Sequence, residues 1–259
     1  MDWLRSQPDQ QDLVRACFFD DPVIDAARRY YQSPEWNEVR RFLPPGKGKA
    51  LDLGAGRGIS SYALATDGWE TSALEPDPSE LVGAGAIRSL MIGTGVSIHV
   101  VEQWGESLPF DDATFDLVYA RQALHHARDL RLLCAEIGRV LKSGGTFIAT
   151  REHVISKPDD LEAFLAKHPL HYLYGGESAY TTSEYRNAIE EGGIRLIQVL
   201  NPLESDINLH PETRSSIKAI AARRLHFPFP TLIPGFLLDF AGSLMNTPGR
   251  LYTFVGRKP

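Results

Sequence analysis

The sequence predicts an α/β protein whose sheet of seven strands is doubly wound and mostly parallel. Three observations support this prediction. From residue 50 onward, short apolar runs alternate with helical stretches, a glycine-rich loop follows the first run, and the alternation ends after residue 151. Such alternation is typical of parallel βαβ units, whose right-handed crossovers place helices on both faces of a sheet.

The individual elements follow from apolar periodicity and from stop signals. Residues 22–42 are predicted to form one amphipathic helix, which Pro44-Pro45-Gly46 ends. In the alternating region we expect strands at 50–53, 71–74, 97–101, 116–120 and 146–150, and helices at 58–66, 78–91 and 128–142. Beyond it we expect a helix at 183–191, a strand at 194–200, a helix at 211–225 and a closing strand at 251–255.

The longest apolar stretch runs from Phe227 to Met245 and contains Pro228, Pro230, Pro234 and Asp239. Prolines and an acid do not suit a membrane span, so we expect a pocket wall or a buried helix there.

Composition narrows the classes of function. The chain has 259 residues and a formal net charge of −6, which disfavours a broad nucleic-acid-binding surface. Cys17 and Cys134 are far apart and in no CxxC arrangement, so neither a disulfide framework nor a zinc–cysteine site is expected. The polar, acidic start MDWLRSQPDQQDLVR is unlike a secretory signal, and we expect a cytoplasmic protein.

The strongest motif is the stretch LDLGAGRGIS, residues 51–60, in which a strand passes through a glycine loop into a helix. Its spacing is GxGxG, and Ile59 stands where a dinucleotide fingerprint carries its third glycine. Asp52 lies inside the strand. A carboxylate there would not help to bind a pyrophosphate, but it can bind the ammonium group of a ligand. Glu75, about 20 residues beyond the first glycine, can accept hydrogen bonds from ribose hydroxyls.

These features resemble the class I S-adenosylmethionine-dependent methyltransferases, in particular the subgroup that acts on small molecules. The resemblance covers residues 50–150 and rests on LDLGAGRGIS, ALEPD, ESLPFDDATFDLVYARQALHH and EIGRVLKSGGTFIAT. It implies a Rossmann-like methyltransferase fold, the cofactor S-adenosylmethionine and the product S-adenosylhomocysteine. Within one domain, residues 1–259, we then expect an N-terminal helical segment (1–45), a cofactor-binding core (46–155) and a substrate cap (156–182 and 201–249).

The resemblance also assigns cofactor-binding residues by position. The methionine end would be surrounded by Asp52, Gly54, Ala55, Gly56 and Gly58. The ribose would be held by Glu75, with Pro76 beside the adenine, and Arg121 would pass under the cofactor.

One departure concerns the adenine amino group. Trp104 replaces the usual acid in the stretch Trp104-Gly105-Glu106, so we expect stacking on Trp104 and backbone contacts near Gly105. Trp104 as a core residue remains an alternative.

Methyl transfer depends mainly on the alignment of the acceptor with the methyl group and the sulfur. A general base is needed only when the acceptor loses a proton. The candidate bases are His153, after the fifth strand, and His126, after the fourth. Predicted substrate-binding residues are Arg151, His171, Tyr172 and Tyr174. We expect no metal site, although His168, His171 and Glu177 leave one open as an alternative.

The sequence therefore predicts a methyltransferase acting on a small molecule such as a natural product or a sugar. An NAD-dependent oxidoreductase and a non-catalytic or protein-directed binding protein remain alternatives. An NPPY-like tetrad, common in relatives that methylate amino groups of DNA and protein, is replaced by Ala120-Arg121-Gln122-Ala123. We expect neither a nucleic-acid partner nor a membrane span, and a homodimer stays open.

Overall fold

The computed structural model describes residues 1–174 and 176–259, and residues 173 and 174 by their backbone alone. Their sheet follows the strand order β3-β2-β1-β4-β5-β8-β7, and a short strand β6 pairs with β5. Only β8 runs antiparallel to its neighbours in this described part of the chain. The strands are β1 (Lys49–Leu53), β2 (Glu70–Leu74), β3 (Ile98–Val101), β4 (Phe115–Arg121), β5 (Leu141–Ile155), β6 (Tyr180–Thr181), β7 (Arg195–Leu200) and β8 (Arg250–Arg257). The predicted fold class is confirmed, with seven strands along the main path and β6 in addition.

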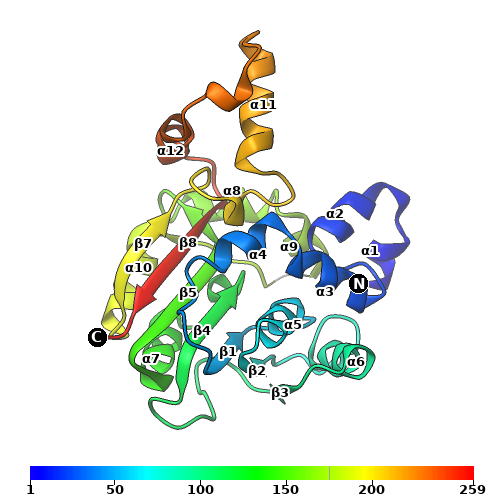
Figure 1. The fold of residues 1–259 in the computed structure, drawn as a ribbon, viewed down its shortest axis with the longest axis vertical. Helices are drawn as coiled ribbons and strands as arrows, with labels where there is room; N and C mark the ends of the chain where they lie inside the picture. Colours follow the sequence, from blue (N-terminus) through cyan, green and yellow to red (C-terminus); the bar gives the residue numbers. More distant parts are fainter. Residues whose placement is uncertain (175) are drawn as a thin grey trace.

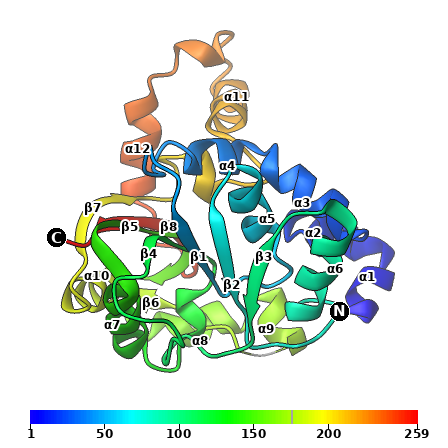
Figure 2. The ribbon, with the colours of Figure 1, turned by 60° about the horizontal axis from the view of Figure 1, so that its bottom comes forward.

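Helices cover both faces of this sheet (Figures 1 and 2). One face carries α3 (Val23–Tyr31), α4 (Pro34–Val39), α5 (Ile59–Thr66) and α6 (Ala84–Thr94), and the other carries α7 (Leu130–Val140) and α10 (Thr182–Glu191). The remaining helices are α1 (Asp2–Ser6), α2 (Gln11–Ala16), α8 (Asp160–Leu165), α9 (Pro169–Tyr174), α11 (Arg214–Arg224) and α12 (Gly235–Ser243). Short 3-10 turns are η1 (Pro8–Gln10), η2 (Leu124–His126), η3 (Asp206–Asn208) and η4 (Pro230–Leu232).

The single helix predicted for residues 22–42 is wrong. Two helices, α3 and α4, stand there, because Ser33 precedes Pro34 and is therefore held in an extended conformation. The Ser33 hydroxyl accepts a hydrogen bond from the backbone N–H of Trp36 and caps α4. The break turns α4 so that Glu35 and Trp36 become fully buried.

Two apolar cores form, one on each face of the sheet. On one face, α7 and α10 pack over β4 and β5 around Phe115, Phe147 and Tyr185. On the other, α3, α4 and α5 pack around Tyr30, Trp36 and Tyr119. The two cores support the parallel strands between them. Open α/β sheets bind their ligands at the carboxyl ends of such strands.

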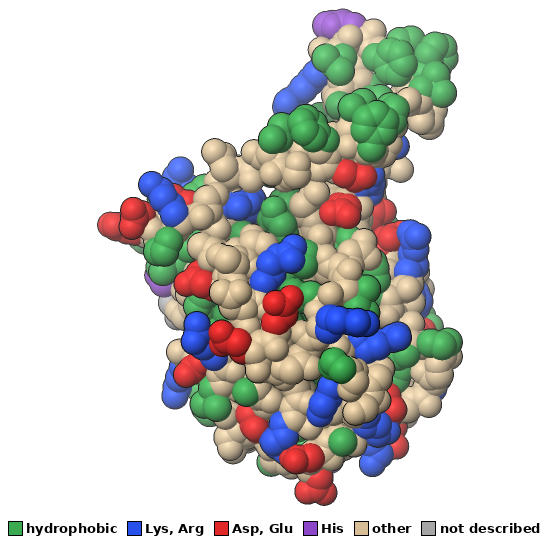
Figure 3. All heavy atoms as spheres, turned by 90° about the vertical axis from the view of Figure 1, so that its left-hand side faces the viewer, with side chains coloured by type: hydrophobic (Ala, Val, Ile, Leu, Met, Phe, Trp, Pro, Cys, Tyr) green, Lys and Arg blue, Asp and Glu red, His purple; other side chains and the backbone are tan. Residues whose placement is uncertain are grey.

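A helical hairpin, made of α11, η4 and α12, projects from the body of the molecule (Figure 1). The expectation that residues 227–245 form a buried helix or pocket wall is wrong. Phe229, Phe236 and Phe240 are 59–65% exposed, and apolar side chains gather on the projecting end in Figure 3. Figure 2 shows α8 and α9 on the opposite side of the molecule, so the two predicted cap segments do not close together.

Candidate active site at the carboxyl ends of the central strands

The glycine loop joins β1 to α5 and passes through the left-handed region of backbone conformation. Gly54 and Gly56 have φ values of +66° and +52°. A Cβ on Gly54 would lie 2.7 Å from that of Ala123, so a side chain there is excluded on steric grounds as well. Gly54 and Ala55 both donate their N–H groups to the carbonyl of Leu74, which ties the loop to β2.

Asp52 is fully buried at the end of β1. Its Oδ2 accepts hydrogen bonds from the hydroxyls of Ser60 (2.8 Å) and Ser61 (2.5 Å), both on α5. Its Oδ1 is buried without a hydrogen-bond partner among the described residues. Burial raises the pKa of Asp52 to about 6, against the opposing effect of the two serines. A buried carboxylate oxygen without a donor requires an external one, such as an ammonium group.

Glu75 lies at the end of β2 and is already engaged with the backbone. Its two carboxylate oxygens accept the N–H groups of Gly56 (2.7 Å) and Asp77 (3.0 Å). Burial raises its pKa. Each carboxylate oxygen keeps a second lone pair, so Glu75 can hold the loop and accept from a ligand hydroxyl at once. Pro76 beside it is half-buried.

The side chains of the residues after β3 are more exposed to solvent than core side chains are. Trp104 is 49% exposed, and the guanidinium of Arg128 lies 4.3 Å from its ring centroid. This excludes the alternative of Trp104 as core. A Cβ on Gly105 would meet Leu133, and Glu106 accepts the backbone N–H of Arg128 at 2.8 Å.

Arg121 ends β4, and its guanidinium is committed to the N-terminal segment. Its Nε and Nη2 donate to the two carboxylate oxygens of Glu35, at 2.7 and 3.0 Å. The rings of Phe18 and Tyr30 each lie 5.3 Å from the guanidinium carbon. Burial opposes ionisation of Glu35, but Arg121 keeps its pKa low. The N-terminal segment is thereby tied to the end of β4.

Two further arginines donate to backbone carbonyls over the same edge of the sheet. Arg57, in the glycine loop, donates to the carbonyls of Phe18 (2.9 Å) and Asp20 (2.8 Å) and pairs with Asp21. Arg151 donates to the carbonyls of Ile207 (2.9 Å) and His210 (3.2 Å). The φ of Arg151 is +60°, which is strained for a residue with a side chain and typical of functional sites.

The predicted catalytic histidines lie in one cluster with His125. His153 is buried, and its Nδ1 lies 3.0 Å from the carbonyl oxygen of Gly249. His126 is exposed, and its Nδ1 lies 2.9 Å from the carbonyl of Gly176. His125 lies between their rings, at 4.7 Å from that of His153 and 4.2 Å from that of His126. Burial, together with the charge of His125, lowers the pKa of His153 to about 3.

The sequence of this chain is similar to those of known methyltransferases. Residues 51–149 match the family described as "Methyltransferase domain". The matched residues form a methyltransferase domain. It is 35% identical over 145 residues to sarcosine/dimethylglycine N-methyltransferase of Halorhodospira halochloris, covering 54% of this chain and 50% of that protein. It is 26% identical to ubiquinone biosynthesis O-methyltransferase of Sinorhizobium fredii, covering 82% of this chain and 84% of that protein.

Solved structures of methyltransferases share the fold. Geranyl diphosphate C-methyltransferase from Streptomyces coelicolor superposes with a TM-score of 0.62 at 14% identity, covering 94% of this chain and 88% of that one. The chain spans about half the length of the Halorhodospira halochloris relative. In the part of the chain that the structure describes, no helix is long and apolar enough to cross a membrane.

The predicted substrate-binding residues separate in space. Arg151 faces the segment 207–210, whereas His171 and Tyr172 line a cavity of about 580 Å³ between α8 and α9. Tyr172 is 88% exposed at its rim. The side chain of Tyr174 lies outside the described residues.

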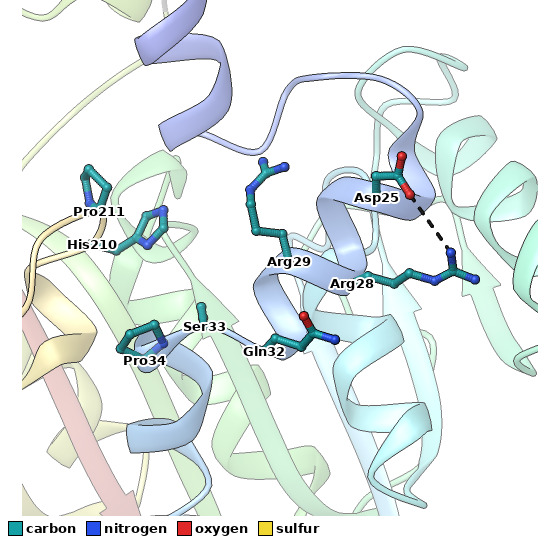
Figure 4. Close-up of a pocket in the computed structure, with 8 residues that line it drawn as sticks. All are labelled: Asp25, Arg28, Arg29, Gln32, Ser33, Pro34, His210 and Pro211. Carbon is teal, nitrogen blue, oxygen red and sulfur yellow. Dashed lines mark ion pairs between the residues drawn. The ribbon is translucent and has the colours of Figure 1, made fainter.

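A second cavity, of about 460 Å³, lies between α3 and the segment after η3 (Figure 4). Arg28, Arg29 and His210 line it, and Asp25 pairs with Arg28 there. None of its lining residues was predicted for the site.

Several side chains of the site were missed from the sequence. Glu35 and Glu152 are both fully buried and hold parts of the site in place. Glu152 accepts backbone N–H groups of residues 123–125 and the Nδ1–H of His125. No local signal reveals them, because Glu35 and Glu152 both have polar neighbours in sequence and their partners, Arg121 and His125, are distant in sequence.

Proposed function

We propose that the protein transfers a methyl group from S-adenosylmethionine to a small-molecule acceptor. The observation that carries this proposal is the unpartnered Oδ1 of Asp52, fully buried at the carboxyl end of β1 beside the glycine loop. An ammonium group is the kind of donor that this oxygen lacks, and the amino acid end of the cofactor has one. The residues present therefore fit the cofactor.

The cofactor would be held by residues at the ends of β1, β2 and β3. Asp52 would bind the ammonium, the backbone of Gly54, Ala55, Gly56 and Gly58 would surround the methionine end, and Glu75 would accept from the ribose. Pro76, Trp104, Gly105 and Glu106 would lie around the adenine. Arg121 would act through its ion pair with Glu35, which holds the N-terminal segment over this edge of the sheet.

When bound, the cofactor supplies a methyl group on a positively charged sulfur. The chain would then orient the acceptor and exclude water. His153 is the proposed catalytic residue, because the carbonyl of Gly249 fixes the proton on Nδ1 and leaves the Nε2 lone pair free to accept from the acceptor. His126 is the second candidate, on the exposed side of the cluster.

The acceptor is proposed to be a small molecule. The named relatives include enzymes for sarcosine and dimethylglycine, for ubiquinone biosynthesis and for geranyl diphosphate. The net charge of −6 supports a small molecule over a nucleic acid. The cavity lined by His171 and Tyr172, together with the neighbouring Tyr174, is the proposed substrate cap region in residues 156–182.

Calorimetry with S-adenosylhomocysteine and with NAD tests the cofactor. We expect micromolar binding of the former and none of the latter. Glu75→Gln should weaken S-adenosylhomocysteine by about 1–3 kcal/mol, because the ribose loses a charged hydrogen-bond partner. Glu80→Gln, an exposed acid nearby in the chain, is the control. NAD binding without S-adenosylhomocysteine binding would reverse the assignment to a dehydrogenase.

His153→Gln tests the catalytic assignment once a methylated acceptor is known. We expect turnover to fall at least tenfold with S-adenosylhomocysteine affinity unchanged, because His153 acts on the acceptor. His226→Gln on the projecting hairpin is the control. Unchanged turnover in His153→Gln would remove it from catalysis, and binding of S-adenosylhomocysteine without methylation of any acceptor tried would favour a non-catalytic binding protein.

A further inference from the structure

Three side chains from separate parts of the chain converge beside β5. His125 comes from η2, His153 from β5, and Glu177 from the segment before β6. One ligand atom of each lies within 4.8 Å of the others. Glu177 is distant in sequence from both histidines, and the parallel pairing of β4 with β5 brings the two histidines together.

The protonation of His125 and His153 is set by partners on the far side of each ring. Nδ1 of His153 faces the carbonyl oxygen of Gly249, which can only accept, so the lone pair is on Nε2. Nδ1 of His125 lies 2.8 Å from a carboxylate oxygen of Glu152, which is fully buried. A carboxylate or a carbonyl behind each imidazole is the usual support of metal-bound histidines.

The third group, Glu177, is poorly satisfied. Its Oε2 is buried and lies 3.3 Å from Nε2 of His125, yet no described residue hydrogen-bonds to it with good geometry. In the metal-free chain a proton on His125 offsets this charge. Burial disfavours the charged form, but the two carboxylates raise the pKa of His125 to about 9, and the interaction with His125 lowers that of Glu177 to about 2.

His168 is close but differs in its chemistry. Its ring centroid lies 5.0 Å from that of His153, and its Nδ1 accepts the backbone N–H of His171 at 3.3 Å. The proton of the neutral ring is therefore on Nε2, which makes it a donor. The set of ligands thus differs from the His168, His171 and Glu177 group that the sequence left open.

We propose that Nε2 of His125, Nε2 of His153 and the carboxylate of Glu177 bind a divalent transition metal, with Zn²⁺ the best match. Two imidazoles and one carboxylate are a common zinc set, and the fourth position is left open to water or to an acceptor. This departs from the expectation of a metal-free site. Metal binding does not depend on the proposed function. If that function also holds, Nε2 of His153 would bind the metal in place of an acceptor proton, and the metal would instead lower the pKa of a hydroxyl acceptor placed there.

Titration of the chelator-treated full chain with Co²⁺ tests the site, since the visible absorption of Co²⁺ reports low coordination. We expect one equivalent of Co²⁺ that Zn²⁺ displaces. Glu177→Gln and His153→Gln should each weaken binding at least tenfold, and Glu152→Gln about 10- to 100-fold through the orientation of His125. Circular dichroism checks the fold of each variant.

The matched control is His226→Gln, an exposed histidine on the hairpin, which should leave Co²⁺ binding unchanged. Absence of stoichiometric Co²⁺ binding by the folded wild type overturns the proposal. So does binding that survives in both Glu177→Gln and His153→Gln, or that His226→Gln abolishes. None of these results depends on S-adenosylmethionine, so failure here leaves the proposed function standing.

The helical hairpin carries a second, independent observation. Eight of the fifteen large apolar side chains exposed in the described part of the chain lie on it or beside it: Leu225, Phe227, Phe229, Leu232, Phe236, Leu237, Phe240 and Leu244. Figure 3 shows this apolar surface at the end of the projection. A patch of this kind marks an interaction site.

The charge of the hairpin identifies its partner. Residues 213–245 hold four basic residues and one acid, whereas the chain as a whole is acidic. Asp239, the acid, pairs with Arg214, and Lys218, Arg223 and Arg224 form no ion pair with the described residues. Exposed arginines next to exposed phenylalanines are complementary to an anionic bilayer surface. The phenyl rings can insert between the acyl chains, and the guanidiniums can bind the phosphates of the headgroups. A hairpin-to-hairpin contact between two copies of the chain would bring like charges together.

We propose that the hairpin binds an anionic membrane surface without spanning it. Co-sedimentation with phosphatidylcholine vesicles, with and without phosphatidylglycerol, tests this. We expect binding that requires the anionic lipid. The Phe236→Ser/Phe240→Ser variant should lose at least tenfold in affinity, and Arg223→Ala/Arg224→Ala about thirtyfold. Ile92→Ser, an exposed apolar residue on α6, is the control. Failure of the wild type to bind, or a dimer in sedimentation that Phe236→Ser/Phe240→Ser dissociates, overturns the proposal.

Discussion

Asp52 and His125 show how differently single residues of this site can be predicted. Asp52 stands within a local motif, so its burial at a strand end follows from the strand and loop around it. His125 and His126 are adjacent in sequence, yet His125 is 1% exposed and His126 lies on the surface. The difference comes from Glu152, a neighbour on β5 that binds the ring of His125. No local pattern reports a partner on another strand, and the sequence therefore singled out His126 and not His125.

The raised pKa of Asp52 has a measurable consequence. Burial raises that pKa to about 6, so the folded chain without cofactor holds a proton that the unfolded chain loses near pH 3.8. The free energy of unfolding should therefore fall, by about 3 kcal/mol, as pH rises from about 4 to 6. Asp52→Asn should remove this dependence. Urea denaturation at several pH values measures it, and a wild type whose stability rises across this range would contradict it.

The same residue links proton release to cofactor binding, because an ammonium group meets a carboxylate and not a carboxylic acid. Affinity for S-adenosylhomocysteine should be constant above pH 6 and fall up to tenfold per pH unit below it. Ser60 and Ser61 donate to the same carboxylate, and Arg121 also lowers its pKa, so neither serine variant is a clean control. Asp52→Asn is the informative variant, since it should bind weakly without this pH dependence.

Among the elements, the predicted strands and the helices between β1 and β5 are found, although α6 begins at Ala84 and not at residue 78. They could be predicted because their periodicity and their glycine stops are local. The segment before β1 was harder to predict. Residues 22–42 form two helices, since a single Ser-Pro step outweighs the amphipathic pattern. The helices α8 and α9 were not predicted. The sequence of α9, PLHYLY, has weak helix propensity, whereas that of α8, DLEAFL, is rich in helix formers and carried a signal that was missed.

The contact of α4 with β4 depends on a buried ion pair. Glu35→Gln leaves the guanidinium of Arg121 without its charged partner, and we expect a loss of about 3–5 kcal/mol in the free energy of unfolding. The control on the same helix is Glu38→Gln, whose partner Arg41 is exposed and whose loss should cost under about 1 kcal/mol. Guanidinium denaturation measures both. Equal effects of the two variants would show that the Glu35 pair does not hold the N-terminal segment.

At the scale of the whole molecule, a layered body carries a projecting hairpin. The doubly wound, mostly parallel sheet could be predicted, because short apolar runs and helical stretches alternate along residues 50–150. The exposure of the apolar side chains in residues 225–244 could not be predicted. An apolar sequence indicates that a segment is covered, but it does not indicate whether its own core or another surface covers it. Burial in the chain's own core was the default, and the contact of Asn201 with α12 instead holds the hairpin at its base.

Replacing residues 214–245 with a flexible Gly/Ser linker tests this division. The hairpin shares few contacts with the body, such as Asn201 Nδ2 with the carbonyl of Asp239. We therefore expect the free energy of unfolding to change by no more than about 1–2 kcal/mol and S-adenosylhomocysteine affinity to stay within about twofold. Loss of cofactor binding in this variant would show that the hairpin belongs to the folding unit of the body.

The arginines that hold the cover of the active site bind main chain. Arg57 donates to the carbonyls of Phe18 and Asp20, and Arg151 to those of Ile207 and His210. Every amino acid has a carbonyl, so what these arginines recognise is the path of the backbone and not the identity of the residue on it. Half-buried side chains in these segments, such as that of His210, can therefore change while the cover keeps its position, whereas Phe18 and Ile207 are buried in the core and are constrained by packing. Variation in the cover is expected at the half-buried positions and not at the buried ones.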